Sequence, residues 1–162
     1  MLEQDDLAAA ARLLDACRAR GVLLATAESC TGGLIAAALT SVGGSSDVVD
    51  RGFITYSNAA KTEMLGVPAA LIADQGAVSE AVARAMAEGA LTRSGATIAV
   101  AVTGVAGPGG GSADKPVGLV WFGLAQRGAP TAAERQVFPG DRTAVRAATV
   151  ARAFALIAAR VA

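Results

Sequence analysis

The sequence contains no histidine, which excludes every catalytic arrangement that uses an imidazole as its base. Without imidazole, and with only Cys17 and Cys30 as thiols, a conventional zinc site is not expected. Lysine is scarce as well: Lys61 and Lys115 stand against twelve arginines, and Tyr56 is the one tyrosine. Arginine stays protonated in proteins and cannot accept a proton. A catalytic base must therefore be a carboxylate, one of the two lysines or Tyr56.

The charge balance and the lack of targeting signals limit the partners. Fourteen basic residues match fourteen acidic ones, so no concentrated positive field favours nucleic acid. Two separated cysteines are typical of a reduced, intracellular protein. The N-terminal segment MLEQDDL lacks a signal peptide's basic and apolar regions, and glycine and proline interrupt the uncharged run 94–113. We expect a cytoplasmic protein that binds neither a membrane nor nucleic acid. We also expect residues 1–162 to fold as a single domain.

Helical and strand patterns alternate along the chain. Apolar spacing predicts helices over 5–19 and 32–42, a helix capped by Asn58 that ends at Gly66, a helix from Ser79, and a last helix after Pro139-Gly140-Asp141. Strands are predicted over 22–27, 52–57, 96–102, 119–126 and 134–138, with loops at 43–46 and 103–118. This alternation favours an α/β fold, a three-layer α/β/α sandwich with a mostly parallel, mixed sheet.

Residues 22–33 form the most informative stretch, because a buried strand runs directly into the sequence Glu28-Ser29-Cys30-Thr31 and a glycine pair. Such a strand-to-helix elbow presents side chains at the carboxyl end of a sheet, where open α/β folds bind ligands. Ser29 and Cys30 are the two possible nucleophiles. Alternatively, Ser29 caps the following helix, and Cys30 either has a pKa lowered by that helix or is an inert core thiol.

Three other stretches carry possible chemistry. Lys61, five residues after Tyr56, is either a surface lysine or a buried base, and Tyr56 orients it, relays a proton or merely packs. The glycine-rich loop 103–116 has the backbone freedom to wrap a phosphate or an acyl oxygen, although it fits neither a Walker loop nor a dinucleotide turn. Arg142 either holds a phosphate or pairs with Asp141 at the surface.

Five ordered segments carry a resemblance to a known family: AESCTGG, RGFITYSNAAK, GAVSE, TGVAGPGGG with KPVG, and FPGDR. Together they resemble the C-terminal domain of the competence/damage-inducible protein CinA over about residues 5–160. Stand-alone members of that family are nicotinamide-nucleotide amidases (NMN deamidases), hydrolases of the pyridine nucleotide cycle and of NAD salvage. The resemblance implies the three-layer fold and hydrolysis of nicotinamide mononucleotide to nicotinic acid mononucleotide and ammonia.

The resemblance also implies roles for individual residues. The nucleophile falls on Ser29 and the general base on Lys61, with Tyr56 assisting. Thr31, Gly32 and Gly33 fall where the acyl oxygen is held, Arg142 would face the 5′-phosphate, and Thr103, Gly104, Ala106 and Gly107 would line the pocket. No cofactor and no metal are expected. The expected partners are the small-molecule substrate and further copies of the chain, as a homodimer or larger homo-oligomer.

Other functions stay open at this point. A related amidase could act on a different small amide. A catalytically silent nucleotide-binding module, or an interaction module in competence or DNA damage, could share the fold. The joint presence of Ser29, Tyr56 and Lys61 favours an enzyme.

Overall fold

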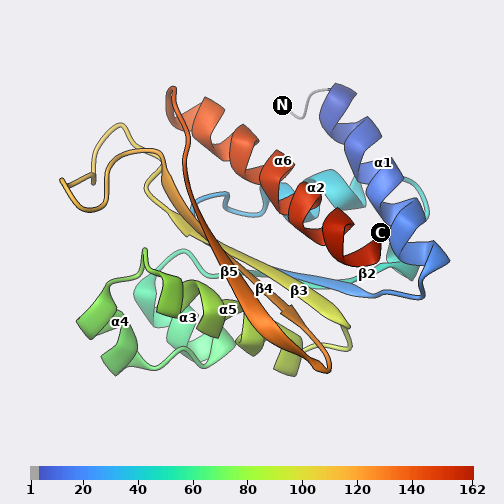
Figure 1. Ribbon diagram of the computed structural model, residues 1–162, viewed down its shortest axis with the longest axis horizontal. Coiled ribbons are helices and arrows are strands. Elements are labelled where there is room, and N and C mark those ends of the chain that lie inside the picture. Colours follow the sequence, from blue (N-terminus) through green and yellow to red (C-terminus); the bar gives the residue numbers. More distant parts are fainter. Residues whose placement is uncertain (1–3) are drawn as a thin grey trace.

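The computed structural model describes residues 4–162 (Figure 1). Along the chain it contains α1 (Gln4–Ala19), β1 (Leu24–Glu28), α2 (Leu34–Thr40), the 3-10 turn η1 (Ser45–Asp47), β2 (Val49–Ile54), α3 (Asn58–Leu65), α4 (Ala69–Gln75), α5 (Glu80–Thr92), β3 (Ile98–Gly104), β4 (Leu119–Gln126), β5 (Ala129–Val137) and α6 (Arg142–Val161). Residues 1–3, which belong to the predicted domain and to the acidic N-terminal segment, lie outside the described residues. No helix in the described part of the chain has the length and apolar character to cross a membrane.

Within residues 4–162 the strands form one five-stranded sheet in the order β2-β1-β3-β4-β5. β1 pairs in parallel with both β2 and β3, whereas β4 is antiparallel to β3 and to β5. Four of these strands consequently run in one direction and β4 runs against them. The sheet is mixed and mostly parallel in direction, as the sequence predicts.

Helices cover both faces of the sheet, with α1, α2 and α6 on one side and α3, α4 and α5 on the other (Figure 1). Both faces of the sheet are apolar and need cover, as β3 illustrates. Ile98, Val100 and Val102 belong to the buried cluster on one face, and Ala99 and Ala101 belong to the cluster on the other. The small side chains on the second face let α5 approach closely. A Cβ on Gly123 would lie 2.1 Å from the carbonyl oxygen of Ala83 in α5. The predicted three-layer α/β/α sandwich is confirmed.

Several element boundaries differ from the predictions. β2 covers 49–54 rather than 52–57, and β5 begins at Ala129 rather than at 134. β5 is an edge strand, where a proline such as Pro130 is tolerated because one side of the strand has no ladder partner. The seven-residue helix α4 was not predicted. Asn58 is not the cap of α3: the Ser57 hydroxyl accepts the hydrogen bond from the N–H of Ala60 at 3.0 Å.

The carboxyl ends of β1, β2 and β3 lie side by side at one edge of the sheet. Hydrogen bonding between neighbouring segments continues just beyond the end of β1. The Ser29 N–H donates to the carbonyl of Val102 in β3 at 3.1 Å. On the other side of β1, the Thr55 N–H donates to the carbonyl of Glu28 at 2.8 Å. This edge brings together the elbow after β1, the segment containing Tyr56, and the loop after β3.

Candidate active site

The elbow after β1 is a tight turn built on two glycines. Gly32 and Gly33 have φ values of +59° and +101°, a region that side-chain-bearing residues rarely adopt. The Gly32 N–H closes the turn on the carbonyl of Ser29 at 3.0 Å, and α2 starts at Leu34. The N-terminus of α2 has no side-chain cap at Gly33, and Ser29 does not serve as one. The Ser29 side chain is therefore available for other contacts.

Glu28 fills the capping role instead, which its position at the end of a strand does not indicate. Its fully buried carboxylate accepts hydrogen bonds from the N–H groups of Ile35 at 2.9 Å and Ala36 at 3.0 Å. It also accepts one from the Thr31 hydroxyl at 2.7 Å. An anion suits the positive end of a helix. Glu28 thus ties the end of β1, the elbow and the start of α2 into one unit.

Lys61 lies in α3 and is 1% exposed. Its Nζ is 3.0 Å from Ser29 Oγ, and it donates to the carbonyls of Thr55 at 2.9 Å and Tyr56 at 3.4 Å. Within residues 4–162 it has no ion-pair partner, and burial lowers the pKa of its ammonium group below the ordinary value of 10.5. The interpretation of Lys61 as a surface lysine is wrong. The structure shows a buried amine against the hydroxyl of the elbow serine.

Cys30, the alternative nucleophile, is 6% exposed. Burial raises the pKa of its thiol to about 11, so the thiol is protonated at neutral pH. The alternative in which the helix terminus lowers the pKa of Cys30 is wrong, because loss of solvation outweighs the favourable charges nearby. Ser29 is the better placed nucleophile.

Ser29 and Lys61 open into a cavity of about 190 Å³. Predicted site residues and newly found ones share its lining: Ser29, Cys30, Tyr56, Asn58, Lys61, Ala77, Val78, Thr103, Gly104, Ala106 and Arg142. Asn58, Ala77 and Val78 were not predicted to line a site. The segment GAVSE, already part of the family pattern, was the available signal for two of them.

The remaining predicted residues lie next to this cavity rather than on its wall. Thr31, Gly32 and Gly33 form the elbow turn, where the Gly32 N–H is already bonded to Ser29. In the described part of the chain, the N–H of Thr31 donates to no carbonyl and to no side chain, and the N–H of Cys30 has its own thiol as partner. Gly107 contributes its carbonyl, which accepts a hydrogen bond from Arg142 at 3.0 Å.

Tyr56 and Arg142 stand at the outer end of the cavity. The Tyr56 side chain is exposed, and its phenol oxygen accepts a hydrogen bond from Arg142 at 3.1 Å. Arg142 and Ala106 also line a second, adjoining groove of about 450 Å³, together with Pro108, Val117, Gly140, Asp141 and Thr143. Arg142 therefore stands between an inner cavity that holds the reactive groups and an outer groove.

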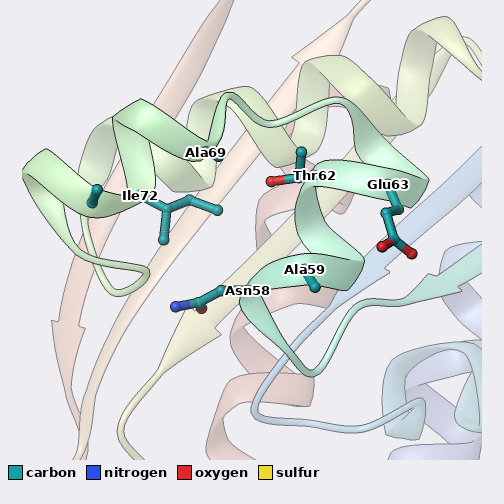
Figure 2. A pocket seen from close by; sticks show the side chains of 7 residues that line it. Asn58, Ala59, Thr62, Glu63, Ala69 and Ile72 are labelled. Carbon is teal, nitrogen blue, oxygen red and sulfur yellow. The ribbon is translucent and has the colours of Figure 1, made fainter.

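A third cavity, of about 430 Å³, lies between α3 and α4 (Figure 2). It shares Asn58 with the cavity at Ser29 and Lys61, but its other walls are Ala59, Thr62, Glu63, Ala69, Ile72 and Ala73. No cationic side chain lines it. Within residues 4–162, no group of three or more histidine, cysteine, aspartate or glutamate side chains is arranged to hold a metal ion. We therefore place the candidate active site in the smaller cavity.

The fold and the site together define a three-layer α/β/α protein with a serine–lysine pair at the carboxyl edge of its sheet. The sequence model of the protein family described as the CinA C-terminal domain matches residues 6–161. The chain therefore belongs to this family. A crystal structure of the competence/damage-inducible protein CihA from Agrobacterium tumefaciens superposes with a TM-score of 0.95 at 49% identity, over 98% of this chain and 97% of that chain.

Curated relatives are of two lengths. A CinA-like protein of Akkermansia muciniphila is 57% identical over 131 residues, which cover 81% of this chain but only 32% of that protein. The chain thus spans about a third of the longer relatives. The nicotinamide-nucleotide amidohydrolase PncC of Enterobacter agglomerans is 56% identical over 131 residues, which cover 81% of this chain and 80% of that protein.

Proposed function

We propose that this chain hydrolyses the carboxamide of nicotinamide mononucleotide to nicotinic acid mononucleotide and ammonia, through an acyl-enzyme on Ser29. The observation that carries the proposal is the 3.0 Å contact between Ser29 Oγ and the buried Lys61 Nζ. An amide is a poor electrophile, so a serine that attacks it needs an adjacent base. The similarity to a relative named nicotinamide-nucleotide amidohydrolase supports the choice of substrate.

The surroundings of Lys61 suit a base. The carbonyls of Thr55 and Tyr56 accept two N–H groups of the neutral amine, which leaves its lone pair for the Ser29 hydroxyl. The lowered pKa of Lys61 increases the neutral fraction at physiological pH. Lysine thereby replaces the imidazole that the sequence lacks, as in Ser-Lys variants of the triad.

The reaction then proceeds in two halves. Lys61 takes the proton of Ser29 as Oγ bonds to the carboxamide carbon, and it returns that proton to the leaving nitrogen as the C–N bond breaks and ammonia departs. In the second half, Lys61 takes a proton from water, whose oxygen attacks the ester. The bond to Ser29 Oγ breaks, and the proton returns to Oγ.

The oxygen of the tetrahedral intermediate needs hydrogen-bond donors. The N–H groups of Cys30 and Thr31 directly follow Ser29 in the elbow, and they are the donors that we assign to this oxygen. Removing one such donor typically costs about 3–4 kcal/mol of transition-state stabilisation. Glu28 and the turn bond of Gly32 keep this backbone in place before substrate arrives.

The remainder of the nucleotide extends toward Arg142. A guanidinium is well suited to bind a phosphate, and Arg142 lines both the catalytic cavity and the outer groove. The nicotinamide ring then occupies the inner cavity beside Thr103 and Gly104, and the 5′-phosphate lies at Arg142. Tyr56 assists by holding Arg142 through its phenol oxygen. A role in NAD salvage, a cytoplasmic location and assembly into a homo-oligomer stay predictions from the family resemblance.

The test is ammonia release from nicotinamide mononucleotide by the purified chain, in the presence of a chelator and beside two serine variants. Ser29→Ala is expected to show no release above the buffer rate. Ser41→Ala is the matched control, since Ser41 lies at the far end of α2 and its hydroxyl donates to the carbonyl of Ala37. Turnover in Ser29→Ala would refute the mechanism. Loss of turnover with chelator would show that a metal is needed.

A further inference from the structure

Lys115, the second of the two lysines, connects the loop between β3 and β4 to helix α4. Its Nζ donates to the carbonyl of Gln75 at 2.7 Å. Gln75 is the last residue of α4, where carbonyls lack partners within the helix and the helix dipole is negative. The backbone of Lys115 is fixed in turn by Ser112, whose hydroxyl accepts from its N–H at 3.1 Å and whose N–H donates to its carbonyl at 2.9 Å.

The backbone at Gly76 leaves room for this contact. Gly76 has φ of +77°, which disfavours any side chain. A Cβ there would lie 2.5 Å from Lys115 Nζ. The conformation and the space at Gly76 are therefore both suited to an ammonium group at the end of α4.

The residues that follow Gly76 form part of the catalytic cavity. Ala77 and Val78 line it, and neither carries a polar side chain. The carbonyl of Ala77 accepts a hydrogen bond from the Thr103 hydroxyl at 2.9 Å, and the carbonyl of Gly76 accepts one from Ser79 at 2.8 Å. The wall formed by Ala77 and Val78 is thus held by β3 on one side. Just before this wall in the sequence, Lys115 bonds the end of α4 at Gln75 to the long loop.

We propose that Lys115 is a positioning residue that fixes the wall formed by Ala77 and Val78 and so sets the affinity for substrate. Its kinetic consequence rests on the proposed amidase function, whereas the tether itself rests on geometry alone. Because Ala77 and Val78 carry no reacting group, loosening the wall changes the fit of the substrate more than the chemical step. Lys115 acts through Gln75 and Gly76, not on the reacting atoms.

The first arm of the test measures hydrogen exchange in the whole chain. Lys115→Met removes the tether but keeps a side chain of similar length. Arg127→Met is the matched control, because Arg127 also donates to carbonyls near a helix end, those of Leu91, Ser94 and Ala96, but does not line the cavity. We expect exchange in segment 76–82 to accelerate about tenfold in Lys115→Met, as a loss of about 1.4 kcal/mol of local stability would give, and to stay unchanged in Arg127→Met.

The second arm measures steady-state kinetics with nicotinamide mononucleotide. For Lys115→Met we expect KM to rise about tenfold while kcat changes less than about twofold, the pattern of lost ground-state and transition-state binding together. Arg127→Met keeps the KM of the parent chain. Parent-like exchange or parent-like KM in Lys115→Met would overturn the proposal. If the parent chain shows no turnover at all, the proposed function fails, while accelerated exchange in Lys115→Met would still support the tether.

Discussion

Replacing Glu28 with glutamine tests whether this carboxylate holds the elbow together. Glutamine keeps one acceptor oxygen and puts a donor in place of the other. Ile35 and Ala36 bond to different oxygens of Glu28, so in either orientation at least one of their N–H groups loses its partner. A hydrogen bond to a charged group contributes about 1.5–3 kcal/mol, and the lost charge at the start of α2 adds about 0.3–1 kcal/mol. We therefore expect Glu28→Gln to lower the free energy of unfolding by about 2–4 kcal/mol.

Thermal unfolding followed by circular dichroism measures this loss. For a chain of this length, 1 kcal/mol corresponds to about 2–4 °C, so the expected fall in Tm is about 5–15 °C. Glu88→Gln is the matched control, since Glu88 is exposed on α5 and its change should stay within about 0.5 kcal/mol. In the fraction that stays folded at 25 °C, kcat should fall as well, because Glu28 supports the Cys30 and Thr31 amides. A Tm equal to that of Glu88→Gln would refute the reasoning.

Three further predictions follow from burial. The proposed role of Lys61 as a neutral base with a lowered pKa predicts that kcat/KM rises with pH and levels off below 10.5; a rise that continues through 10.5 would contradict the lowered pKa. Cys30→Ala should keep kcat within about tenfold, since a protonated thiol takes no part in the chemistry, and an inactive but folded variant would contradict this. Gly89→Ala should lower the free energy of unfolding by more than about 2 kcal/mol, because the new Cβ would lie 2.1 Å from the Leu65 carbonyl oxygen. Urea unfolding measures this loss, and a midpoint equal to that of the parent chain would show that α3 and α5 can move apart.

The family resemblance, rather than the strand pattern, predicted that Ser29 and Lys61 act together. The structure supplies the physical reason for their meeting: the elbow and the segment leading into α3 follow two parallel strands, whose carboxyl ends share one sheet edge. The lack of histidine then left few bases to consider. The protonation of Cys30 could not be predicted in this way, because it depends on how much protein covers the thiol.

The contributions of Glu28, Ala77 and Val78 were not predicted because they depend on contacts between distant segments. In the sequence, Glu28 is only the polar last residue of a strand. Its capping role depends on the fold, which brings the first N–H groups of α2 to its carboxylate. Ala77 and Val78 have apolar side chains, which do not indicate a functional site. They line the cavity in the segment that follows α4. α4 itself has seven residues, too few for a distinct helical pattern.

The most direct test of the central claim is to find the acyl group on the protein. The chain is mixed with nicotinamide mononucleotide, quenched in acid within the first turnover, digested with trypsin and analysed by mass spectrometry. The peptide covering 21–51 contains both Ser29 and Cys30. We expect this peptide to gain the mass of nicotinic acid mononucleotide less one water, with fragmentation placing the gain on Ser29. A gain on Cys30, or rapid turnover with no covalent species under conditions that trap a chemically prepared ester, would contradict it.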